Sequence, residues 1–69
     1  MTTKHIIQVK NIEEAQPKDL NIICIYVNDY LGGGWEVVCW DSTNQTGYTT
    51  DGREYSKLSF TNWFSLEGL

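Results

Sequence analysis

The sequence is short of basic side chains and of long apolar runs, and each shortage excludes a class of protein. Five lysines and arginines stand against nine aspartates and glutamates, so the net charge is −4. This charge repels a phosphate backbone and disfavours nucleic acid as a partner. No apolar run is long enough to cross a bilayer, and residues 1–9 lack a signal-peptide core. We therefore expect a cytoplasmic protein without a membrane partner.

Cysteine and histidine are too few for a structural zinc site. The chain has two cysteines, Cys24 and Cys39, and one histidine, His5, whereas structural zinc takes about four such ligands at close spacing. Both cysteines lie in apolar runs, where a thiol packs as a small hydrophobic side chain. We expect two free thiols, no metal and no cofactor.

The sequence also lacks a recognisable catalytic set. A nucleophilic site needs serine or cysteine beside a general base, and the single histidine begins an expected strand. The acidic residues are spread along the sequence, as solvated surface charges are. With 69 residues the chain makes one domain (residues 1–69), whose thin core leaves little volume for a catalytic pocket. We expect no enzymatic activity.

The stretch from Leu20 to Leu31 is compatible with two structures. Apolar residues recur at helical spacing, with polar residues on the opposite side. The β-branched and aromatic run at residues 22–27 has strand propensity instead. We expect a helix over residues 20–31 and keep a strand as the alternative.

Three consecutive glycines, Gly32, Gly33 and Gly34, follow the expected helix. Glycine adopts the left-handed conformation at little cost, so we expect a helix C-cap here. A phosphate-binding glycine loop leads into a helix N-terminus, whereas these glycines precede an expected strand. As an alternative, these glycines and Trp35 supply backbone donors and a stacking surface for a small ligand such as a nucleotide.

Strand-forming residues and turn signals predict the remaining elements. Residues 5–10 are rich in β-branched side chains and predict a first strand. Turns at Asn44-Gln45 and at Asp51-Gly52, the latter a type I′ candidate, divide the rest into a meander. Its strands are residues 35–43, 46–50 and 53–60, with Tyr48 opposite Tyr55.

The expected fold is therefore α+β. It is a small single domain of order β-α-β-β-β, in which one helix packs on an antiparallel meander. The alternative is an all-β domain, which applies if residues 20–31 form a strand.

The segment from Leu31 to Val38, with Gly34, Trp35 and Glu36 inside it, resembles part of a known pattern. A strand, a helix ending in Leu-Gly, then Gly-Trp-Glu and two aliphatics is similar to small domains of unknown function from bacteria and their phages. The resemblance covers roughly residues 4–40. It implies a strand–helix–strand unit and a phage or mobile-element source. It implies no agreed chemistry and no catalytic or binding residue.

Large apolar side chains fall on both faces of the expected meander. One face carries Trp35, Val37, Cys39, Tyr48 and Tyr55, and the other carries Val38, Trp40, Leu58 and Phe60. One helix covers only one face of so small a sheet. Aromatic surface is then left over for a partner, unless the tail residues Trp63, Phe64 and Leu66 fold across it and seal it.

These features predict a small acidic protein that binds another protein, itself as a homodimer, or both. The leading hypothesis is an inhibitor that occludes the surface of a host protein in the host cytoplasm. The candidate contacts are Trp40, Tyr48, Tyr55, Val38, Leu58 and Phe60. The alternatives are an oligomer that binds or sequesters a nucleotide-like ligand and a purely structural homo-oligomer.

Overall fold

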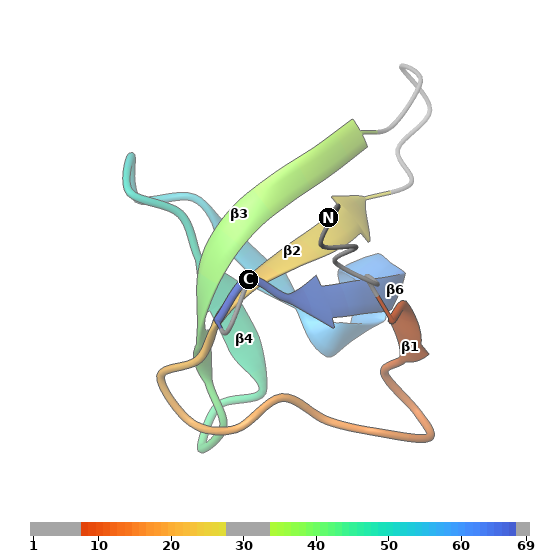
Figure 1. Cartoon of the computed structure of the whole chain (residues 1–69). Helices are drawn as coiled ribbons and strands as arrows, with labels where there is room; N and C mark the ends of the chain where they lie inside the picture. The colour runs from red at the N-terminus through yellow and green to blue at the C-terminus, as the bar shows by residue number, and fades with distance from the viewer. Residues whose placement is uncertain (1–7, 28–33, 68–69) are drawn as a thin grey trace, which may run out of the picture.

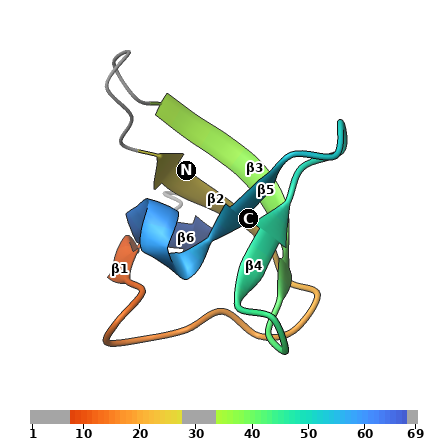
Figure 2. The ribbon, with the colours of Figure 1, turned by 180° about the vertical axis from the view of Figure 1, so that it is seen from behind.

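Six antiparallel strands form one strongly curved sheet in the order β1-β6-β2-β3-β4-β5 (Figure 1). The computed structural model describes residues 8–27 and 34–67. The strands are β1 (Lys10–Asn11), β2 (Ile22–Val27), β3 (Gly34–Asp41), β4 (Thr46–Tyr48), β5 (Glu54–Ser56) and β6 (Phe60–Ser65). A short 3₁₀ turn, η1 (Lys57–Ser59), joins β5 to β6 (Figure 2). Within these residues there is no α-helix.

The predicted α+β fold is wrong, because Ile22–Val27 forms a strand where we expected a helix. This strand, β2, pairs with β3 on one side and with β6 on the other. Its β-branched side chains lose rotamer freedom in a helix but pack well on a pleated sheet. The all-β alternative is the observed fold. The expected helix C-cap is also wrong at Gly34, which begins β3, while Gly32 and Gly33 lie outside the described residues.

The N-terminal strand β1 contributes two residues to the sheet, whereas the C-terminal strand β6 contributes six. The expected first strand at residues 5–10 reaches the described part of the chain at residue 8, and there only Lys10 is in a strand. The C-terminal residues pack back on the body as β6, which inserts between β1 and β2. Because strand side chains alternate, Trp63 points into the core and Phe64 to the opposite face. The tail therefore does not fold across a sheet face as a seal.

The core lies on the concave side of the curved sheet. Its buried side chains are Ile12, Ile23, Ile25, Val38, Trp40, Phe60 and Trp63. Curvature brings the Trp40 ring of β3 to within 5.9 Å of the Phe60 ring of β6, in an edge-to-face arrangement. The Trp63 indole N–H donates to the Ala15 carbonyl at 2.9 Å, which attaches the segment between β1 and β2 to the core.

The first hairpin turn lies at the predicted place, although its strands are shorter than predicted. Residues 42–45 form the turn, and β3 ends at Asp41. The Asp41 carboxylate accepts from the side chain and backbone of Asn44 and from the backbone of Thr43. The Asn44 side-chain bond contributes most to holding the pKa of Asp41 below its usual range. Short-range hydrogen bonds thus fix the turn that leads into β4.

The second hairpin has a register one residue away from the predicted one. Tyr48 lies opposite Glu54, and Tyr55 lies opposite Gly47. A type I′ turn needs positive φ at both central residues, but here Gly52 has φ 89° and Asp51 is not positive. The Thr49 N–H donates to the Arg53 carbonyl at 2.9 Å and closes a longer loop. A shift of one residue moves Tyr55 to the core side of the sheet, where it is half-buried.

Gly47 provides a stability test of this packing. A Cβ atom added at Gly47 would lie 2.5 Å from Cγ2 of Val38, whereas one added at Gly34 would meet nothing within 4 Å. We expect Gly47→Ala to lower the free energy of unfolding by about 1–3 kcal/mol through overpacking. Gly34→Ala is the matched control and should change it by less than about 1 kcal/mol. Urea denaturation of both variants measures this, and equal stability of the two would contradict the packing.

Candidate functional site

Apolar side chains also cover the convex side of the sheet. They come from β2, β3, β4 and β6, because residues paired directly across antiparallel strands point to the same face. This surface, called the outer face below, consists of Ile22, Cys24, Tyr26, Trp35, Val37, Cys39, Tyr48 and Phe64. None of these side chains is charged.

The outer face is largely open to solvent. Trp35 is 50% exposed and Val37 is 54% exposed, and Ile22 and Tyr26 beside them are also exposed. From the size of such side chains, the apolar area is on the order of 400 Å². The largest apolar patch on a typical monomer spans about 300–600 Å² and is often functional, which makes this face the candidate site. Val9, Leu20 and Leu58 are exposed too, but they do not lie on the strands of this face.

Three aromatic rings form a fixed cluster on the outer face. The Tyr26 and Trp35 rings are 5.1 Å apart and meet edge to face, and the Trp35 and Phe64 rings are 5.3 Å apart. The indole of Trp35 is therefore held between two neighbours while half of its surface remains exposed. An aromatic ring held in place in this way loses little conformational entropy when it is buried by a partner.

A shallow hollow of about 280 Å³ lies beside this cluster. It is lined by Ile22, Val37, Val38, Cys39, Tyr48, Thr49 and Thr50. It sits where the sheet passes from β3 to β4, and most of its lining side chains belong to the outer face. It suits an aliphatic or aromatic side chain of a partner better than a polar ligand, because its lining offers no charged group.

Arg53 connects the second hairpin to β3. Its guanidinium donates to both carboxylate oxygens of Glu36, at 3.0 and 3.1 Å, to Asp51 and to the Tyr55 hydroxyl. The bonds to Glu36 contribute most to raising the pKa of Arg53, and the Thr49 hydroxyl followed by Arg53 lowers the pKa of Asp51. Arg53 and Asp51 are exposed and Glu36 is partly exposed, so these ion pairs fix the orientation of the loop more than they stabilise the fold.

The predicted contact residues do not lie together on one surface of the structure. Trp40, Val38 and Phe60 are buried in the core, with Trp40 fully inaccessible, so in the folded chain they offer almost no surface to a partner. Tyr55 packs against the core, and Leu58 is exposed alone on η1.

Of the six predicted contacts, only Tyr48 lies on the outer face. Trp35, predicted for ligand binding, lies there too, in its aromatic cluster. Ile22, Tyr26 and Phe64 also belong to this face and were not predicted to lie on it. Alternation along residues 22–27, taken as a strand, indicates the first two.

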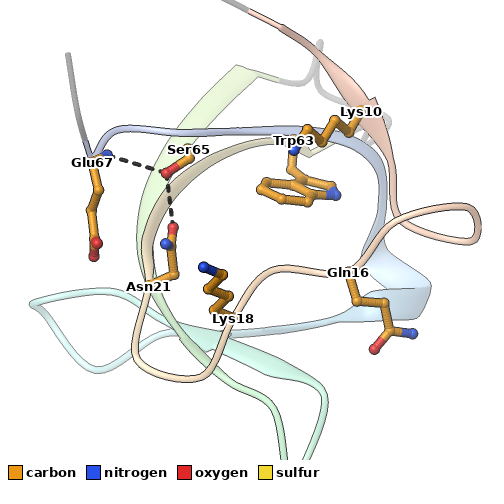
Figure 3. A pocket seen from close by; sticks show the side chains of 7 residues that line it. All are labelled: Lys10, Gln16, Lys18, Asn21, Trp63, Ser65 and Glu67. Carbon is orange, nitrogen blue, oxygen red and sulfur yellow. Dashed lines mark hydrogen bonds between the residues drawn. The ribbon is translucent and has the colours of Figure 1, made fainter.

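A second hollow, of about 360 Å³, opens at one end of the curved sheet (Figure 3). It is lined by Lys10, Gln16, Lys18, Asn21, Trp63, Ser65 and Glu67. Its polar groups bond largely to one another, since the Ser65 hydroxyl donates to the Asn21 amide oxygen at 3.1 Å and accepts from the Glu67 N–H. The Glu67 carboxylate accepts in turn from the backbone N–H of Ile22. Its two lysines are exposed surface residues, so this hollow indicates no particular ligand.

Residues 8–27 and 34–67 contain no group of three histidine, cysteine, aspartate or glutamate side chains placed to hold a metal ion. In the same part of the chain, no helix is long and apolar enough to cross a membrane. Comparison with known proteins gave no matching family model, no matching curated protein and no matching solved structure.

The two thiols of the outer face should differ in reactivity. Cys24 is buried, and burial, followed by the nearby Glu36 charge, raises the pKa of its thiol, whereas Cys39 is half-exposed. We expect Ellman's reagent at about pH 8 to modify Cys39 at least about tenfold faster, because the thiolate is the reactive form. The single variants Cys24→Ser and Cys39→Ser isolate each rate. Equal rates in the folded protein would contradict the assigned burial.

Proposed function

We propose that this chain is a non-enzymatic protein-binding domain and that the outer face is its contact surface. The observation that carries the proposal is the exposed cluster of Tyr26, Trp35 and Phe64 among the uncharged side chains that make up the outer face. Aromatic side chains with desolvated apolar neighbours supply most of the binding energy at protein interfaces.

The partner is a different protein rather than a second copy. Two outer faces together would bury on the order of 800 Å², below the about 1,200 Å² at which stable specific interfaces begin. Each copy also carries a net charge of −4, so two copies repel while a basic partner is attracted. An acidic domain that covers the working surface of a basic protein acts as an inhibitor. A phage or mobile-element source rests on the resemblance around Gly34, Trp35 and Glu36.

The nucleotide-binding alternative gains no specific support. Gly34 and Trp35 lie in β3, and the Trp35 ring packs between aromatic neighbours on an open face. The residues that line the hollow at the end of the sheet are not among those predicted for the ligand.

Capture from a bacterial lysate tests the proposed surface with a matched pair of variants. Trp35→Ser removes the central ring of the outer face, and Leu58→Ser removes an 86% exposed side chain from η1. We expect a defined set of proteins to be retained by wild type and by Leu58→Ser and to be lost with Trp35→Ser, because the anchor ring is gone.

Urea denaturation checks that both variants fold. Retention of the same proteins by all three chains would contradict the proposed surface. A sedimentation mass equal to a dimer would contradict the choice of a different protein as partner.

A further inference from the structure

The N-terminal part of β3 has a strand neighbour on one side only. It pairs with β2 from Gly34 to Cys39, but with β4 only from Cys39 to Asp41. Figure 1 shows β3 continuing well beyond the end of β4. Among residues 8–27 and 34–67, no strand pairs with the other edge of β3 between Gly34 and Val38. This stretch is called the free edge below.

The hydrogen bonds of β3 identify the backbone groups that face the free edge. The Trp40 N–H donates to the Asn21 carbonyl at 2.9 Å, and the Trp40 carbonyl accepts from the Leu20 N–H at 2.7 Å, so the Trp40 backbone faces the β2 side. In an antiparallel ladder this direction alternates along the strand, so Val38 and Glu36 also bond towards β2.

The backbone groups of the residues between these, Trp35 and Val37, face away from β2. The N–H and C=O groups of Trp35 and Val37 therefore point out of the free edge. Their side chains are the two most exposed of the outer face. Backbone donors and acceptors that no strand of residues 8–27 and 34–67 pairs with thus lie directly beside the proposed contact surface and its hollow.

Protein sheets protect exposed edges with charged side chains, proline, a bulge or a covering segment, because an unpaired strand recruits another one. The free edge, with sequence Gly-Trp-Glu-Val-Val, has no lysine, no proline and no register shift in its pairing with β2. Its one charged residue, Glu36, is held by the Arg53 guanidinium at 3.0 Å. Backbone and side chains are therefore both available to an added strand.

We propose that the free edge of β3 binds an extended segment of a partner protein as an additional strand. The proposal rests on the proposed function and specifies how the partner is held. Backbone hydrogen bonds to Trp35 and Val37 supply the pairing. Alternate side chains of the added strand lie over the hollow beside Val37 and Tyr48, which takes an apolar residue. Because the chain carries a net charge of −4, the segment contains lysine or arginine among its polar positions.

A second copy is disfavoured in the register that pairs both edge-facing residues of each copy. Pairing two free edges about a two-fold axis, with Trp35 opposite Val37, places the Glu36 side chains of the two copies directly opposite each other. Like charges at directly paired positions destabilise an antiparallel ladder. The heterologous strand avoids this contact and matches the charge of the chain.

Selection from a phage-displayed library of linear peptides of about ten residues supplies the probe. We expect enriched sequences to alternate apolar with polar or basic residues and to lack proline at their centre. Each amide of one enriched peptide is then N-methylated in turn. Affinity should fall at least about tenfold at every second amide and stay nearly unchanged at the amides between them, since only alternate N–H groups face the free edge.

Two measurements on the protein complete the test. Val37→Pro removes an edge-facing N–H, whereas Val37→Ala keeps this N–H and only shortens the side chain. The loss of peptide affinity on N-methylation at every second amide should therefore disappear with Val37→Pro and persist with Val37→Ala. Should Val37→Pro not fold, amide exchange of wild type decides. The bound peptide should slow exchange at Trp35 and Val37 by at least about tenfold and leave Glu36 and Val38, already bonded to β2, nearly unchanged.

The outcomes separate this proposal from the proposed function. Peptides that require Trp35 but tolerate N-methylation at every position overturn strand addition and leave the outer face as a contact surface. Failure to select any peptide on the wild-type chain also overturns strand addition, while capture with Trp35→Ser and Leu58→Ser still tests the outer face.

Discussion

The alternation of side chains along β3 governs the rest of the structure. Val38 and Trp40 point into the core, whereas Trp35 and Val37 point away from it, so one strand supplies apolar residues to both faces. Curling the sheet brings Trp40 against Phe60 and buries the concave face. The described chain adds no second layer over the convex face. Covering about 400 Å² of apolar surface is worth on the order of 10 kcal/mol before association costs, which is large beside the stability of a domain of this size. An open face of this kind favours a partner.

The strands of the first hairpin were predicted from the sequence, whereas β2 was predicted to be a helix. The Trp35–Trp40 run is aromatic and β-branched, and its strand and following turn lie close to where we predicted them. Residues 22–27 are apolar at almost every position because β2 is a central strand with large apolar side chains on both of its faces. A continuous apolar run of this kind also satisfies the i, i+3, i+4 spacing of a helix, because nearly every position in it is apolar. Strand propensity was the better guide because the chain offers the sheet on which β-branched residues pack.

The candidate site was less predictable than the fold. The alternation of residues 35–40 between the two faces of the sheet was predicted correctly. Which of these faces becomes buried depends on the long-range packing of β6 and of Ile12. Most of the predicted contacts therefore belong to the core. Tyr55 changed face because the loop at residues 49–53 is longer than a two-residue turn. The free edge depends on where β4 stops pairing with β3, and no local pattern in the sequence specifies that point.

Solvent exposure of the three tryptophans tests the account most directly. Fluorotryptophan incorporated into the whole chain gives one fluorine NMR signal for each residue, and the shift of each signal between light and heavy water reports contact with solvent. We expect a clear solvent-isotope shift for Trp35, which is 50% exposed, and almost none for Trp40 or Trp63, which are 0% and 4% exposed. Trp→Phe variants assign the signals. A shielded Trp35 in the free monomer, or a solvent-exposed Trp40, would contradict the division of the sheet into a buried and an open face.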